Sequence, residues 1–307
     1  QVRCNVSGST AAGQNDFFHI VYLRLDRSLN HKNICTTIVP AGGKMSTLKN
    51  PLPFRKRFVR LVRRKLTTDH RKQRKSYMLG IIGAMKAEVE QLKQEMKQPE
   101  VVTVAGMEFY KGTIGEKEVV VVQSGIGKVS AALCVQILAD RFGVDGVVNT
   151  GIAGSLKAEI NIGDLVLSTD AIQHDVDATN FGYPLGEIPQ LGTLTFEADE
   201  RLRGLAKKCC EEVNPDISIY EGRVLTGDQF ICDKKKKEWL SETFNGSCTE
   251  MEGAAIAQAA YLNKIPFLIV RAISDKADDS ASMDYPEFER QAIIHSTNLT
   301  RALILAY

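Results

Sequence analysis

The 307-residue chain has no long hydrophobic run and no metal-ligand or disulfide pattern among its seven cysteines. Its longest apolar stretches, such as 119–122 and 265–270, fall far short of the ~20 residues that a bilayer-spanning helix needs. The cysteines form no CxxC pair and share no ligand spacing with histidine, which argues against a zinc site and a disulfide framework. We therefore expect no membrane span, no metal, and a reducing, cytoplasmic setting.

The chain also lacks an overall charge imbalance, since 39 Lys and Arg face 37 Asp and Glu. This balance hides one basic segment, residues 55–75, in which eleven Lys or Arg face the single acid Asp69. Such a segment could bind nucleic acid or a membrane surface. It stands outside the part of the chain that reads as folded, so we expect neither as a partner.

Residues 1–77 show no sustained hydrophobic periodicity and contain glycine, serine and the prolines Pro51 and Pro53. We predict that they form a disordered basic N-terminal extension without catalytic purpose, with a targeting role as the competing idea. Met78 opens a strand-like segment. Residues 78–307 are therefore the predicted folded domain.

From residue 78 onward, strand-like and helix-like patterns alternate. Strands are predicted at 79–84, 101–104, 109–114, 119–123, 146–150, 164–171, 219–225, 247–251 and 266–273, the third and fourth joined as a hairpin. Helices are predicted at 85–96, 129–142, 198–213, 235–244, 253–263 and 286–306. This order predicts a single α/β domain with a central mixed β-sheet flanked by helices. In such sheets, ligands bind beyond the carboxyl ends of the strands.

Three carboxylic acids stand at or beside the ends of predicted strands. Asp275 follows the strand at 266–273, where burial would raise its pKa and suit it to act as a general acid. Glu88 lies in the first turn of a helix, whose dipole favours the anion and suits it to accept a proton. Glu252 precedes an alanine-rich helix, and its oxygens suit the vicinal hydroxyls of a ribose. Alone, each would be a turn, cap or surface residue, but together they predict an acid/base pair with a sugar clamp.

Eight motifs follow one another along residues 78–307. They are GIIGAMKAEV (80–89), SGIGKV (124–129), NTGIAG (149–154), GDLV (163–166), HDVDATNFGY (174–183), TGDQFI (226–231), EMEGAAIA (250–257) and RAISDKAD (271–278). In these motifs the chain resembles the 5′-methylthioadenosine/S-adenosylhomocysteine nucleosidases of the nucleoside phosphorylase superfamily. The resemblance implies hydrolysis of the N-glycosidic bond of adenine nucleosides that carry a 5′-thioether, and also of 5′-deoxyadenosine.

The resemblance implies a role for each candidate residue. Asp275 would protonate N7 of the adenine, and Glu88 would deprotonate the attacking water, with Arg271 ordering that region. Glu252 would hold the ribose hydroxyls while Met251 packs on the sugar. The reaction would pass through an oxocarbenium-like state, which nearby carboxylates stabilise.

A substrate pocket is implied as well, with Phe230 on the adenine plane and the backbone of Ile231 at its edge. The other implied contacts are Met85, Ile126, Ala153, Gly154, Ser274 and Tyr285, with Phe181 and Pro189 reaching across from a second subunit. The resemblance therefore implies a homodimer. Ile152 stands where some relatives have Ser or Thr, which leaves the preferred 5′ group open.

Three other functions stay open. A phosphorolytic purine nucleoside phosphorylase needs an arginine-rich anion site, whereas Met85 and Glu88 stand where phosphate would be repelled. A futalosine-type nucleosidase would share the chemistry, and a nucleoside-binding or storage protein would keep the pocket without catalysis. No cofactor is expected, because residues 125–130 give only a weak dinucleotide signal and His174 has no second histidine nearby for a metal.

Overall fold

The computed structural model describes residues 2–5, 20–23, 36–39, 77–276 and 285–307. The chain divides into two compact units, Gln1–Gln73 and Arg74–Tyr307. In the first unit, β1 (Val2–Asn5), β2 (Ile20–Leu23) and β3 (Thr36–Val39) form an antiparallel sheet, and none of these strands was predicted. The basic segment and most of the extension lie outside the described residues, so the predicted disorder there stays a prediction.

The second unit contains every strand predicted for it, together with one short strand that was missed, β10. Their bounds are β4 (Leu79–Gly83), β5 (Lys97–Val104), β6 (Met107–Ile114), β7 (Lys117–Gln123), β8 (Gly146–Ser155), β9 (Leu165–Gln173), β10 (Phe196–Glu197), β11 (Ile219–Thr226), β12 (Cys248–Glu250) and β13 (Phe267–Asp275). The predicted hairpin is confirmed, since β6 and β7 pair antiparallel up to Ile114 opposite Lys117. Gly115 in its turn has a φ of 60°, which glycine adopts without strain.

The strands form one mixed sheet in the order β10-β9-β11-β12-β8-β4-β7-β6-β5, and β13 pairs with both β8 and β9. This double pairing closes β9, β11, β12, β8 and β13 into a ring, which the sequence did not predict. One edge of β8 pairs along its length with β13, while the other pairs with β4 at residues 146–149 and with β12 at 154–155. β8 therefore belongs to both the open sheet and the ring.

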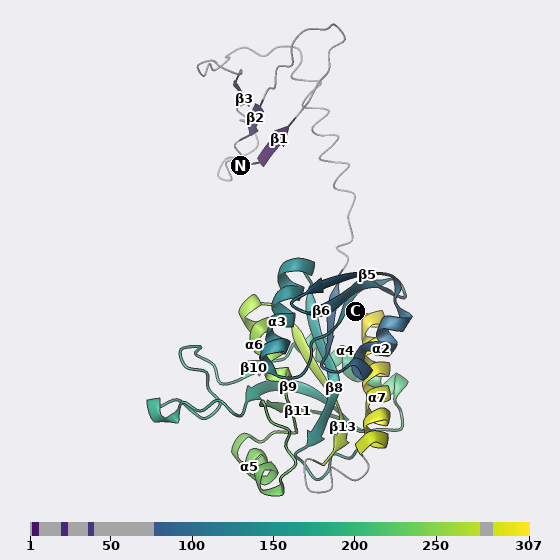
Figure 1. The fold of residues 1–307 in the computed structure, drawn as a ribbon, viewed down its shortest axis with the longest axis vertical. Helices are drawn as coiled ribbons and strands as arrows, with labels where there is room; N and C mark the ends of the chain where they lie inside the picture. Colours follow the sequence, from purple (N-terminus) through teal and green to yellow (C-terminus); the bar gives the residue numbers. More distant parts are fainter. Residues whose placement is uncertain (1, 6–19, 24–35, 40–76, 277–284) are drawn as a thin grey trace. The chain divides into compact units, whose positions relative to one another are not determined.

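The helices also lie where the sequence placed them. They are α2 (Lys86–Glu95), α3 (Lys128–Ile137), α4 (Glu200–Val213), α5 (Lys234–Phe244), α6 (Gly253–Asn263) and α7 (Tyr285–Ala306). The helix predicted at 129–142 is α3 continued by a π-helical turn, η1 (Leu138–Phe142). In Figure 1, α3 and α6 lie on one side of the sheet and α2, α4 and α7 on the other. No helix in the described part of the chain is long and apolar enough to cross a membrane.

Every residue of β4, β8 and β13 is buried. Helices on both faces of the sheet explain why these strands read as continuous apolar runs rather than as alternating ones. Strands packed on both faces hold their ends rigidly. Residues that follow or end these strands are therefore fixed in position before any ligand arrives.

Candidate active site

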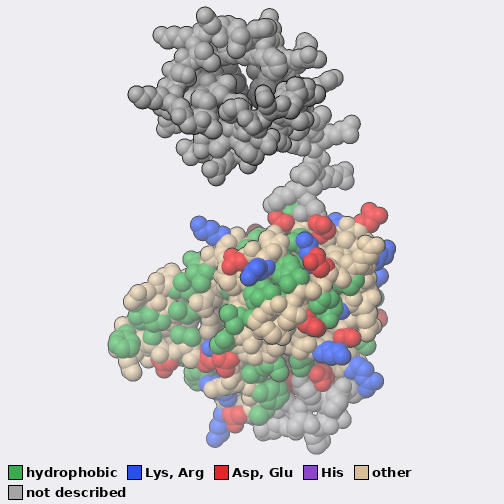
Figure 2. Space-filling model, turned by 45° about the horizontal axis from the view of Figure 1, so that its top comes forward, with side chains coloured by type: hydrophobic (Ala, Val, Ile, Leu, Met, Phe, Trp, Pro, Cys, Tyr) green, Lys and Arg blue, Asp and Glu red, His purple; other side chains and the backbone are tan. Residues whose placement is uncertain are grey.

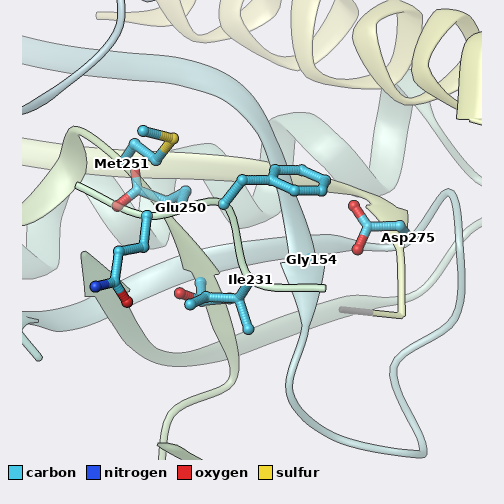
Figure 3. Close-up of a pocket in the computed structure, with 8 residues that line it drawn as sticks. Gly154, Ile231, Glu250, Met251 and Asp275 are labelled. Atoms are coloured by element: carbon cyan, nitrogen blue, oxygen red, sulfur yellow. The ribbon is translucent and has the colours of Figure 1, made fainter. Parts of the chain in front are cut away.

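A pocket that is partly open to solvent lies near the ends of β8, β11, β12 and β13. It is lined by Gly154, Gln229, Phe230, Ile231, Thr249, Glu250, Met251 and Asp275. Figure 3 shows Met251 and Asp275 on opposite sides of this pocket, with Ile231 and Gly154 between them. Segments from four distant parts of the sequence thus converge on one cavity.

Asp275 is the last residue of β13 and is only 4% exposed. Its Oδ2 accepts a hydrogen bond of 2.9 Å from the Ser274 hydroxyl. The register against β8 shifts between Ile273 and Asp275, so that Asp275 pairs with Gly154. Such irregularities redirect a side chain at the end of a strand. Here the result is a carboxyl group on the wall of the pocket.

Glu88 lies in the first turn of α2 and is 2% exposed. Its Oε2 accepts the backbone N–H of Met85 at 2.8 Å, and its Oε1 accepts that of Ile152 at 3.2 Å. Burial raises the pKa of Glu88, and the positive charge of Arg271 and the backbone donors only partly oppose this. Burial therefore outweighs the helix dipole on which the sequence argument relied. The carboxylate is a stronger base as a result.

Arg271 joins the three glutamates of the site. Its guanidinium is 1% exposed, pairs through Nη2 with Glu250, and lies 3.7 Å from Oε2 of Glu252. A side chain at Gly151 would collide with the Arg271 guanidinium and would approach Oε1 of Glu88 to 2.5 Å. Glycine at this position therefore lets Arg271 and Glu88 meet. Burial would lower the pKa of Arg271, but the surrounding glutamates raise it overall.

Glu252 is the N-cap residue of α6 and is 5% exposed. Its Oε1 accepts the backbone N–H of Gly127 at 2.9 Å, which ties α6 to the loop before α3. Burial, followed by the negative charge of Glu250, raises the pKa of Glu252 to about 7, and Arg271 opposes the shift. The site therefore places three acidic side chains, Glu88, Glu250 and Glu252, beside one guanidinium.

The structure brings several of the predicted site residues together. Gly154, Phe230, Ile231, Met251 and Asp275 line the pocket. Ala153 and Ser274 are buried beside two of these residues, at 5% and 2% exposure.

Four of the predicted contacts lie at or beyond the edge of this arrangement. The backbone N–H of Met85 donates a hydrogen bond to Glu88. The exposed Ile126 directly precedes Gly127, whose backbone N–H donates to Glu252. The exposed Phe181 and Pro189 are not among the residues that line the pocket. The side chain of Tyr285 falls outside the described residues, so its predicted role stays a prediction.

Sequence reasoning missed three residues that line the pocket, Gln229, Thr249 and Glu250. Gln229 directly precedes Phe230, and Glu250 stands two residues before Glu252. One feature of the sequence could have indicated Glu250: it is a charged residue at the end of a strand whose other residues are buried. An unpaired charge is costly in such a place, so a partner could have been expected.

Comparison with known proteins identifies the family of the chain. The family model described as the phosphorylase superfamily matches residues 78–305, so the chain is an α/β protein of that class. A 5′-methylthioadenosine/S-adenosylhomocysteine nucleosidase of an Exiguobacterium strain is 41% identical over 226 residues, 73% of this chain and 96% of the relative. The enzyme of the same name from Bacillus thuringiensis is 41% identical over 221 residues, 72% of this chain and 95% of the relative. The chain belongs to this nucleosidase family.

Solved structures give the same result. The 5′-methylthioadenosine/S-adenosylhomocysteine nucleosidase of Colwellia psychrerythraea, in complex with adenine, is 39% identical with a TM-score of 0.72, covering 75% of this chain and 95% of that one. A futalosine hydrolase of Helicobacter pylori is 35% identical with a TM-score of 0.71, covering 76% and 99%. The chain is almost equally similar to these two structures in TM-score. The comparison therefore does not indicate which 5′ substituent the chain prefers.

The raised pKa of Glu252 predicts a pH dependence of stability. Because the pKa is raised from 4.5 to about 7, the folded state binds this proton more tightly than the unfolded chain does. This contribution to stability is complete below about pH 4.5 and is lost as the pH rises through about 7, on the order of 3 kcal/mol in all.

Glu252→Gln removes the titrating group, so the free energy of unfolding of the wild type relative to this variant should fall between about pH 5 and about pH 8. Urea denaturation of both proteins at the two pH values measures the difference. A constant difference would contradict the assignment.

Proposed function

We propose that the chain hydrolyses the N-glycosidic bond of 5′-methylthioadenosine and S-adenosylhomocysteine to adenine and the 5-substituted ribose. The observation that carries this proposal is that Asp275 and Glu250 line the same pocket. Glu250 forms an ion pair with Arg271. Through Arg271 the pocket is joined to the buried Glu88 and Glu252. Relatives of the chain that are 41% identical carry the name of this activity.

The acid of the proposed reaction is Asp275. Adenine leaves poorly as an anion, and a proton delivered to N7 makes it a neutral leaving group. The carboxyl group lies at the end of a rigid strand, and one of its oxygens accepts a hydrogen bond from the Ser274 hydroxyl. A positioned acid of this kind contributes roughly 10²- to 10⁴-fold to a rate.

Glu88 is the proposed base, and it acts on the attacking water. Its two oxygens already accept backbone N–H groups, which fix the direction of the remaining lone pairs. Arg271 lies next to it and orders the same region. Glu252 holds the ribose hydroxyls, and the ionised carboxylates of the cluster stabilise the positive charge that develops on the sugar.

Substrate recognition is proposed to combine stacking, backbone contacts and apolar packing. Phe230 stacks on the adenine and the Ile231 backbone binds its edge, while Met251 packs on the sugar. Met85 and Ile126 contact the 5′ substituent, where each buried methylene contributes about 0.8 kcal/mol. Apolar 5′ groups should therefore bind more tightly than polar ones.

Hydrolysis is favoured over phosphorolysis by the charge of the site. Three buried carboxylates, Glu88, Glu250 and Glu252, surround the single guanidinium of Arg271. A phosphate dianion would need several donors and would meet repulsion from these carboxylates. Water carries no charge and meets no such barrier.

The identity of the products tests this conclusion. With 5′-methylthioadenosine as substrate, we expect adenine and 5-methylthioribose in equal amounts, at a rate independent of added phosphate. Mass spectrometry of the sugar decides the question, and a phosphorylated sugar would make the protein a phosphorylase instead. Parallel assays with S-adenosylhomocysteine, 5′-deoxyadenosine and futalosine rank the 5′ groups. Binding without turnover of any of them would indicate a nucleoside-binding protein.

Removing the acid or the base should nearly abolish turnover. We expect Asp275→Asn and Glu88→Gln each to lower kcat by roughly 10²- to 10⁴-fold while the nucleoside still binds, because both amides keep the shape of the acid. The exposed pair Asp216→Asn and Glu212→Gln serves as the matched control and should retain full activity. Steady-state kinetics and calorimetric binding measure the two effects. Near-normal turnover in either site variant would refute its assigned role.

Two further features belong to the proposal. We propose a cytoplasmic setting, which the five cysteines found as free thiols in the described part of the chain support. We also propose a homodimer. Its support is a set of exposed apolar residues, Ile126 just before α3 and Val129 and Leu133 on it, at 59%, 74% and 48% exposure. Contiguous exposed apolar surface commonly marks a protein interface.

The segment between β9 and β10 supports the dimer as well. It projects from the body of the second unit in Figure 1, and Figure 2 shows hydrophobic side chains gathered on it. It carries a short 3₁₀ helix, η2 (Thr179–Phe181), and Phe181 is 84% exposed. An aromatic ring so exposed is available to a partner surface, and we propose that it covers the 5′ end of the substrate in a second subunit.

Phe181→Ala tests this part of the proposal. In a dimer that shares Phe181 with the neighbouring pocket, we expect the KM for 5′-methylthioadenosine to rise at least several-fold, since an apolar wall is lost. Sedimentation measures the mass of both proteins, and Val213→Ala is a matched control at another exposed apolar site. A monomeric wild type, or an unchanged KM, would contradict the shared pocket.

A further inference from the structure

Glu250 ends β12, and its side chain is 3% exposed. Its carboxylate accepts four hydrogen bonds from the protein. The donors are Nη2 of Arg271, the hydroxyl of Thr226, and the backbone N–H groups of Glu252 at 3.1 Å and Gly253 at 2.8 Å. Three of these donors reach Oε2 and the Thr226 hydroxyl reaches Oε1, so the protein itself takes up most of the acceptor capacity of this carboxylate. Glu250 lines the pocket beside Met251 (Figure 3) but is committed to the protein around it.

The hydrogen bond from Thr226 has a fixed direction. The parallel register of β11 and β12 places Thr226 beside Glu250. Oγ1 of Thr226 accepts the backbone N–H of Ala254 at 2.7 Å, so its single proton points to Oε1 of Glu250. A group that also donates cannot replace the carboxylate here without placing two donors face to face.

These hydrogen bonds join the start of α6, which carries Glu252, to Arg271. The proposed reaction needs Glu252 at the ribose and Arg271 at the attacking water. The N–H groups of Glu252, Gly253 and Ala254 belong to the start of α6, where helices leave donors without intrahelical partners. Glu250 and Thr226 satisfy all three. The same carboxylate holds Arg271, whose Nη2 also donates to Oδ1 of Asn149 at 2.5 Å.

We propose that Glu250 is a positioning residue for the nucleosidase reaction: its carboxylate locks Arg271 to the first turn of α6, so that Glu252 faces the ribose while Arg271 faces the water at Glu88. The inference rests on the proposed function, because the ribose and the water belong to that reaction. Glu250 itself touches neither the adenine nor the reacting atoms. Its effect should therefore appear in ribose binding and water activation, and not in adenine binding.

Glu250→Gln in the full chain tests the inference. The amide keeps the shape of the acid but loses its charge and turns one acceptor into a donor, which breaks a buried pair. We expect kcat/KM for 5′-methylthioadenosine to fall roughly 100-fold, with KM raised and kcat lowered, while the Kd of adenine, measured by calorimetry, changes less than threefold. Glu212→Gln is the matched control on the exposed face of α4.

A second pair of variants separates positioning from a general loss of structure. Thr226→Val removes the hydroxyl and should lower kcat/KM roughly tenfold, whereas Thr226→Ser keeps the hydroxyl and should restore it to within twofold. If Glu250→Gln leaves both kinetic constants within threefold of the wild type, the inference is wrong. It is equally wrong if adenine and nucleoside binding fall together, or if the valine and serine variants behave alike.

Failure of the proposed function would look different, because the wild type itself would then turn over no nucleoside. In that case, the calorimetric Kd of 5′-methylthioadenosine replaces KM. Weaker binding of the nucleoside to Glu250→Gln, with adenine binding unchanged, would still support the positioning role. Equal effects on the two ligands would overturn it.

Discussion

The arrangement of the site depends on one buried cation, the guanidinium of Arg271. A charge removed from water costs several kcal/mol unless it is paired and hydrogen-bonded. The chain meets this requirement with carboxylates from three elements, Glu250 at the end of β12, Glu252 before α6 and Glu88 in α2. The end of β12 and the starts of α6 and α2 must therefore lie close to the same point. Gly151 keeps that point free of a side chain.

The closed ring of strands explains how the other half of the site meets this cluster. β13 lies between β8 and β9, and it carries both Arg271 and Asp275. One strand, buried along its whole length, thus holds the cation of the cluster and the carboxyl of the pocket. The distance between the two is set by covalent geometry and strand packing, and not by a loop. This rigidity suits a reaction in which the leaving base and the attacking water lie on opposite sides of the sugar.

The order of strands and helices could be predicted from the sequence because periodicity and breakers are local signals. The partners of the strands could not: β13 reads as an ordinary buried strand, and nothing local indicates that it pairs with both β8 and β9. Glu88, Glu252 and Asp275 were found because each stands at the start of a helix or the end of a strand. Glu250 was missed since its hydrogen bonds reach β11, β13 and α6, which are far apart in the sequence. The dominant cause of the pKa shift of Glu88 was missed for the same reason, because burial depends on packing.

The cluster is not built for maximal stability. Burial, followed by the negative charge of Glu250, raises the pKa of Glu252 to about 7, so keeping this carboxylate charged costs free energy. A protein selected for stability alone would replace such a group with apolar side chains. Carboxylates held in fixed positions have a use where a sugar passes through a positively charged state, because they stabilise that charge without reorganising. Sites that break the local rules of stability are where function is expected, and this cluster breaks them at the wall of the pocket.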